Sequence, residues 1–179
     1  MSSGKVCAIL GRRLAKHELL TLTIEAGIGL AGFAGIAVVL SGDSRNWSPA
    51  EKLRIGTMLF LALYAVFGAF LCLYLLRHFE GVPASRISSG ISFAILLFAN
   101  MVVLKKSRTP FREGDPTINR RLAYILWGLF MAVAIFQLMN AAGLFRDAFA
   151  AYFASLIFLL LFAAFLFVRI LFVRPGMQG

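Results

Sequence analysis

Five apolar stretches in this chain are each long enough to cross a lipid bilayer as a helix. The hydrocarbon core is about 30 Å thick, so roughly 20 apolar residues are needed for one helical crossing. Inside a bilayer no water satisfies backbone N–H and C=O groups, which favours helices. We therefore predict an all-α integral membrane bundle of five transmembrane helices with short loops, at Leu19–Leu40, Ile55–Leu76, Ile87–Leu104, Leu122–Phe145 and Ala148–Val173.

The composition leaves little room for a water-soluble domain. Of the 179 residues, 60% are hydrophobic and the mean hydropathy is +0.86, against about 45–50% apolar residues in typical globular domains. The predicted organisation is a basic leader over 1–18, the transmembrane domain over 19–173 and a short tail over 174–179. The leader repeats an apolar residue every four positions at Val6, Leu10 and Leu14. It fits an interfacial amphipathic helix or a frayed tail.

Charge lies in the connections and the leader, and the net charge is +10. Basic loops without a soluble fold indicate contact with anionic lipid headgroups rather than with nucleic acid. We name the side where the first helix begins side A, which collects seven Lys and Arg, and the opposite side B, which collects eleven. The positive-inside rule then favours a cytoplasmic C-terminus, although the four cations before the first helix argue for the reverse.

No motif in the sequence predicts catalysis. Cys7 and Cys72 form neither a CxxC pair nor a zinc-ligand spacing, and no nucleotide loop or hydrolase triad is present. We therefore expect no catalytic residues, no metal and no cofactor, and a protein that is not an enzyme.

Glu25 is a carboxylate inside the first apolar stretch, six residues past Leu19. An ionisable group there costs about 2.5–3.5 kcal/mol on insertion scales and usually faces a bundle interior or a water-filled path. The alternative is a side chain that reaches back to the headgroups of side A, since its predicted depth is about 9 Å.

Two amides fall at a similar predicted depth. Gln137 and Asn140 share one helix face at i, i+3 and lie about 12 Å and 7–8 Å from side A. We predict that Glu25 is hydrogen-bonded to one or both of them, which would form a proton- or cation-handling site. The alternative is that the two amides only form structural hydrogen bonds between neighbouring helices.

Small residues follow Glu25 along the same helix. Gly27 and Ala31, and Ala31 and Gly35, are spaced four apart, and Gly32 lies between them. Such residues let helix backbones approach closely. The surface suits packing within the protomer or the axis of a homo-oligomer.

The run from Glu25 to Ile36 (EAGIGLAGFAGI), together with Trp47, Arg54 and Arg86-Ile87-Ser88-Ser89-Gly90, resembles a group of small polytopic bacterial inner-membrane proteins. That group has no activity attached to it, so the resemblance implies a multi-pass protein of the bacterial inner membrane and nothing about chemistry.

These observations lead to two functional hypotheses. The first is a homo-oligomeric ion channel or permeation module, with Glu25 as the ionisable pore group and Gln137 and Asn140 in support. The second is a non-catalytic accessory or scaffolding subunit that docks on other membrane proteins. In both, the lipid bilayer is a partner, and in the first the chain is its own partner.

Overall fold

The computed structural model describes residues 3–40, 49–79, 82–112 and 120–172, and these ranges fold as five helices without a strand. The predicted all-α fold is confirmed, because all five helices are long and apolar enough to cross a membrane. The predicted tail over 174–179 lies outside the described residues. The helices are α1 (Ser3–Leu40), α2 (Pro49–His78), α3 (Val82–Arg112), α4 (Arg120–Ala141) and α5 (Ala148–Phe172).

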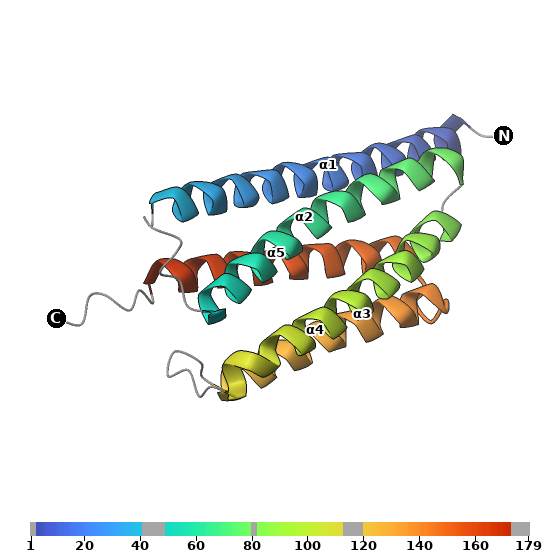
Figure 1. Ribbon diagram of the computed structural model, residues 1–179. Coiled ribbons are helices and arrows are strands. Elements are labelled where there is room, and N and C mark those ends of the chain that lie inside the picture. Colours follow the sequence, from blue (N-terminus) through green and yellow to red (C-terminus); the bar gives the residue numbers. More distant parts are fainter. Residues whose placement is uncertain (1–2, 41–48, 80–81, 113–119, 173–179) are drawn as a thin grey trace.

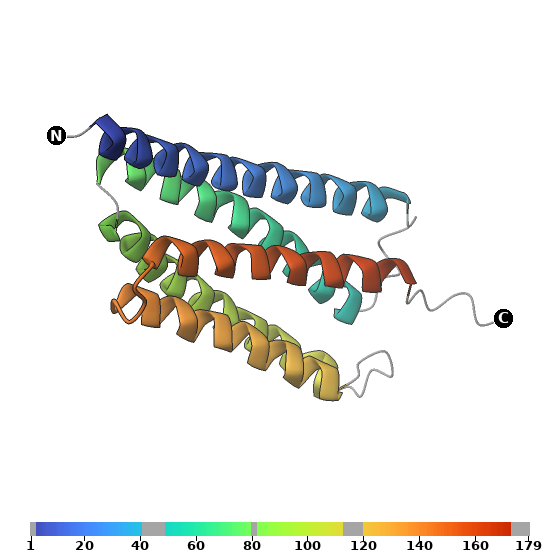
Figure 2. The ribbon, with the colours of Figure 1, turned by 180° about the vertical axis from the view of Figure 1, so that it is seen from behind.

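The helices run alternately between the two sides of the bundle (Figure 1). The α2–α3 and α4–α5 connections lie at the N-terminal end of α1, which is side A. Figures 1 and 2 place α1 along one edge and the α3–α4 pair along the other, with α2 and α5 between them. Accordingly, α1 packs against α2 and α5, whereas α4 packs against α3 and α5.

Helix α5 is the centre of the bundle, because it packs against all four other helices. Half of the residues in its most apolar stretch are buried, against 28% in α1, α3 and α4. The many Phe and Leu residues of this helix would by themselves suggest a lipid-facing position. Apolar content does not separate the two environments, because lipid tails are as apolar as a bundle interior.

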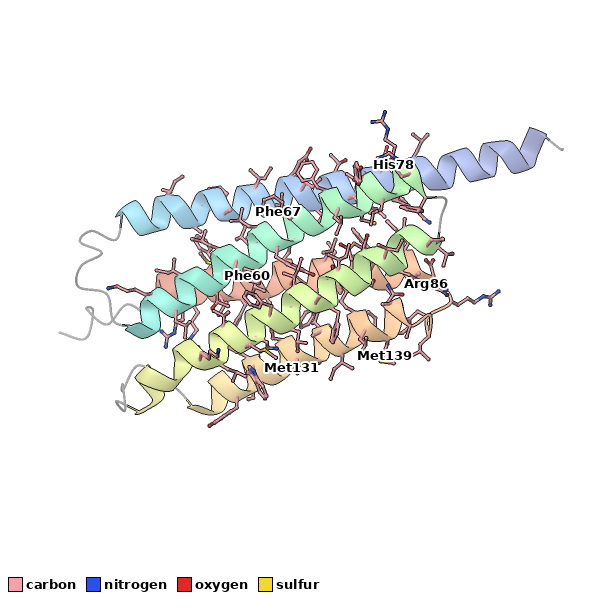
Figure 3. All side chains as sticks on the ribbon, turned by 45° about the vertical axis from the view of Figure 1, so that its right-hand side comes forward. Phe60, Phe67, His78, Arg86, Met131 and Met139 are labelled. Atoms are coloured by element: carbon pink, nitrogen blue, oxygen red, sulfur yellow. The ribbon has the colours of Figure 1, made fainter. Side chains whose placement is uncertain are left out.

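The helices extend beyond the apolar stretches that predicted them. Helix α1 runs unbroken from Ser3 to Leu40, so the basic leader forms the first turns of the same helix as the first span. In Figure 3 these turns project past the ends of the neighbouring helices. The candidate membrane span in α1 begins at Leu14, five residues before the predicted start at Leu19.

Helix α4 ends at Ala141 and not at Phe145 as predicted. Gly143 has a φ of 83°, and the N–H groups of Gly143 and Leu144 donate to the carbonyls of Asn140 and Met139. This left-handed glycine and its two bonds form a Schellman motif, which stops the helix. The Arg86 guanidinium packs over Gly143 at the carbonyl end of α4, beside the α4–α5 connection (Figure 3), where a cation is favourable.

Helix α5 begins directly after Asp147. The backbone N–H of Ala150 donates to Oδ1 of Asp147 at 3.1 Å, as expected for an N-cap aspartate. The short turn makes α4 and α5 antiparallel neighbours, which brings Gln137 and Asn140 beside the first two turns of α5.

Candidate functional site

Glu25 lies on the outer face of α1 and is exposed. The opposite face of α1 packs on the bundle through a stripe of buried or half-buried residues: Leu20, Ile24, Gly27, Ala31 and Ala34. Gly27 is the point of closest approach, since a Cβ placed there would lie 2.5 Å from Cγ2 of Val66 and 3.1 Å from the Ala62 carbonyl oxygen. Helical geometry then points Glu25, two residues earlier, away from this contact.

Glu25 lies inside the candidate membrane span Leu14–Ile36, well past its first residue. Lys16 marks the edge of side A, because its Nζ lies 4.8 Å from the ring centroid of Phe149 in the first turn of α5. Glu25 comes nine residues later, roughly 13 Å deeper by helical rise.

The predicted pairing of Glu25 with Gln137 or Asn140 is wrong. Both amide side chains are fully buried and bonded elsewhere, while Glu25 is exposed on α1 at the opposite edge of the bundle from α4 (Figures 1 and 2). The depths predicted from residue counting were similar, but the positions of α1 and α4 around the bundle separate these side chains.

Gln137 and Asn140 instead bond α4 to its neighbours. Gln137 Nε2 donates to Ser155 Oγ at 2.6 Å, and Ser155 Oγ donates to the Tyr152 carbonyl. Asn140 Nδ2 donates to Ser89 Oγ on α3 at 2.7 Å and to the Ala148 carbonyl at 2.9 Å. Asn140 thus joins three helices close to side A.

Replacing Asn140 with leucine should lower the free energy of unfolding in mixed micelles by about 1 kcal/mol, since two bonds of about 0.6 kcal/mol each are lost. Ser89→Ala removes only one of the two bonds and should cost about half as much. Titration of the folded fraction with a denaturing detergent measures both. An Asn140→Leu variant as stable as the wild type would show that these bonds do not hold the hairpin.

The four small residues predicted to pack helices fall on two faces. Gly27 and Ala31 face the bundle core, as the within-protomer interpretation requires. Gly32 and Gly35 are exposed, and nothing lies within 4 Å of a Cβ placed at either. With the exposed Gly29 they leave a shallow surface beside Glu25. One line of exposed residues, named the outer stripe here, follows this face: Glu18, Leu22, Glu25, Gly29, Gly32 and Ile36.

Sequence reasoning missed the serine face of α3. Ser85, Ser88, Ser89 and Ser92 are all buried, and their spacing of three, four and seven residues places them on one side of the helix. That spacing is visible in the sequence and indicates a polar helix face. Tyr152 was missed too, and its hydroxyl donates to the Gly68 carbonyl at 2.8 Å.

No group of three His, Cys, Asp or Glu side chains that could hold a metal ion occurs within the described ranges. Comparisons with protein-family models, curated proteins and solved structures found no match. The fold and the five spans define the class: a polytopic membrane protein built as a five-helix bundle.

Proposed function

We propose that the protein is a homo-oligomeric ion channel or permeation module, in which the outer stripes of several copies surround a shared axis. One observation carries the proposal: a carboxylate inside a candidate membrane span, on a face that the protomer leaves uncovered. Against lipid this position costs about 2.5–3.5 kcal/mol. A second protein surface over α1 removes the carboxylate from lipid.

The spacing of the outer stripe favours a second copy as that surface. Its residues alternate at intervals of four and three, which is the 3.5-residue repeat of parallel helices that pack along a common seam. Gly29 and Gly32 allow close approach of neighbouring backbones just past Glu25. In a closed ring each copy presents the same face to the axis, so the Glu25 carboxylates gather at one depth. Such a ring favours cations.

The interior of one protomer is a poorer ion path. Toward side B the core is filled by apolar side chains, among them Leu96, Phe130, Leu159, Phe162 and Leu166. An ion crossing this layer would lose its hydration without gaining a ligand. Gln137 and Asn140 accordingly support the channel by fixing the bundle and not by touching the ion.

Disulfide cross-linking in native membranes tests the shared axis. In a chain carrying Cys7→Ser and Cys72→Ala, Gly32→Cys places a thiol on the outer stripe, and oxidation should give a covalent dimer of this chain. Ala34→Cys is the matched control, since Ala34 is 1% exposed and faces the bundle, and it should stay monomeric. Absence of a Gly32→Cys dimer would overturn the homo-oligomer, and cross-linking to a different polypeptide would favour the accessory-subunit hypothesis.

A further inference from the structure

The half of the bundle near side A has a polar interior that Glu25 does not share. Side chains from four helices form it, and we name this group the polar core: Tyr64 on α2, Ser85, Ser88, Ser89 and Ser92 on α3, Gln137 and Asn140 on α4, and Tyr152 and Ser155 on α5. The hydrogen bonds of Gln137, Asn140 and Tyr152 account for only part of its bonding capacity.

Three oxygen atoms of the polar core have no hydrogen-bond partner among the described residues: Oε1 of Gln137, Oδ1 of Asn140 and Oγ of Ser85. A buried polar atom left unpaired costs about 1–3 kcal/mol. Several such atoms in one region therefore indicate a ligand that bonds to them.

The chemistry of these atoms identifies the ligand class. The two amide oxygens can only accept hydrogen bonds, and the Ser85 hydroxyl can donate or accept. No charged side chain is among the buried residues described, so a bare ion there would lack a counter-charge. Water fits the set, because it supplies two donors and is held in proteins by two to four polar partners.

The polar core spans one half of the membrane. Ser85 lies in the first turn of α3, at side A. Ser92 is ten residues into that helix, roughly 15 Å deep, and faces the hydroxyls of Tyr64 and Tyr152. Beyond it, Leu96, Phe130 and Leu159 are buried and apolar, and Leu96 lies between the polar core and the buried amide of Asn100, whose Nδ2 donates to Met131 Sδ nearer side B. We propose that the polar core is a half-channel occupied by water, which exchanges with side A and ends near the midplane.

This inference does not depend on the proposed function, since it concerns the interior of one protomer and not the oligomer axis. Cys72 offers a native reporter. Its thiol is fully buried on α2 and lies beside Ser88. A thiol proton exchanges with deuterium when water reaches it.

The experiment follows the infrared S–H band of the Cys7→Ser protein in vesicles after transfer to D2O. The Cys72 band should be lost to the S–D position within the mixing time. The control carries Cys7→Ser, Cys72→Ala and Ala163→Cys, which places the thiol at a fully buried position in the apolar half of α5. Its S–H band should persist.

Two results would overturn the half-channel. One is a Cys72 band that persists as long as the control band, which would mean a dry polar core. The other is equally fast exchange at both positions, which would mean that water enters by opening of the whole bundle.

Discussion

Replacing Glu25 with glutamine should reduce cation flux into liposomes by at least about tenfold. Glutamine has nearly the same shape but no charge, so a ring of these side chains no longer offsets the cost of dehydrating a cation within the membrane. A loss of about 1.4 kcal/mol in stabilisation of the cation at the barrier corresponds to that factor. The measurement is the initial rate of flux at matched protein content.

Glu18→Gln is the matched control for this substitution. Glu18 lies on the same outer stripe and is exposed, but it comes only two residues after Lys16 at the edge of side A. Flux through this variant should stay close to that of the wild type. Unchanged flux in Glu25→Gln, or a wild-type protein that is monomeric and conducts no ion, would contradict the channel.

The substitution Gly27→Val should destabilise the protomer by about 1–3 kcal/mol, the range for overpacked cores. The added Cβ would overlap Val66 Cγ2 and crowd the Ala62 carbonyl. A carbonyl within α2 cannot yield without moving that helix, so α1 must separate from α2 and from Leu160 on α5. The free energy of unfolding in mixed micelles reports this loss.

Gly29→Val controls for the change in helix propensity, because both substitutions place a β-branched residue in the same helix. Nothing lies within 4 Å of a Cβ at Gly29, so the protomer should keep its stability. Equal destabilisation by the two variants would show that the cost is conformational and that Gly27 is not a packing contact.

The five spans were predictable because a bilayer enforces helices wherever about 20 apolar residues follow one another. The contacts between the helices were not predictable in the same way. Helix α5 is as apolar as a lipid-facing helix, yet it is the central helix of the bundle. The early end of α4 depends on the positive φ of Gly143 and on its bonds to the preceding turn, and apolar residues continue past it in the sequence.

The sequence singled out Glu25, Gln137 and Asn140 as candidate residues, but it did not predict which residues they contact. Gln137 and Asn140 bond neighbouring helices, which was the alternative to their pairing with Glu25. Their pairing with Glu25 failed because counting residues gives depth, whereas the partner of a side chain depends on which helices are adjacent. Ser155 and Ser89 were the missing partners, and both lie on helices that contact α4.

The central position of α5 also bears on how the protein is made. The last of the five described helices supplies the partners of Gln137 on α4 and of the Gly68 carbonyl on α2. Before α5 inserts into the membrane, α1 to α4 lack the helix against which each of them packs. The polar groups of α2 and α4 that bond to α5 then face lipid or one another. A chain truncated before Ala148 would therefore leave Gln137 and the Gly68 carbonyl without these partners.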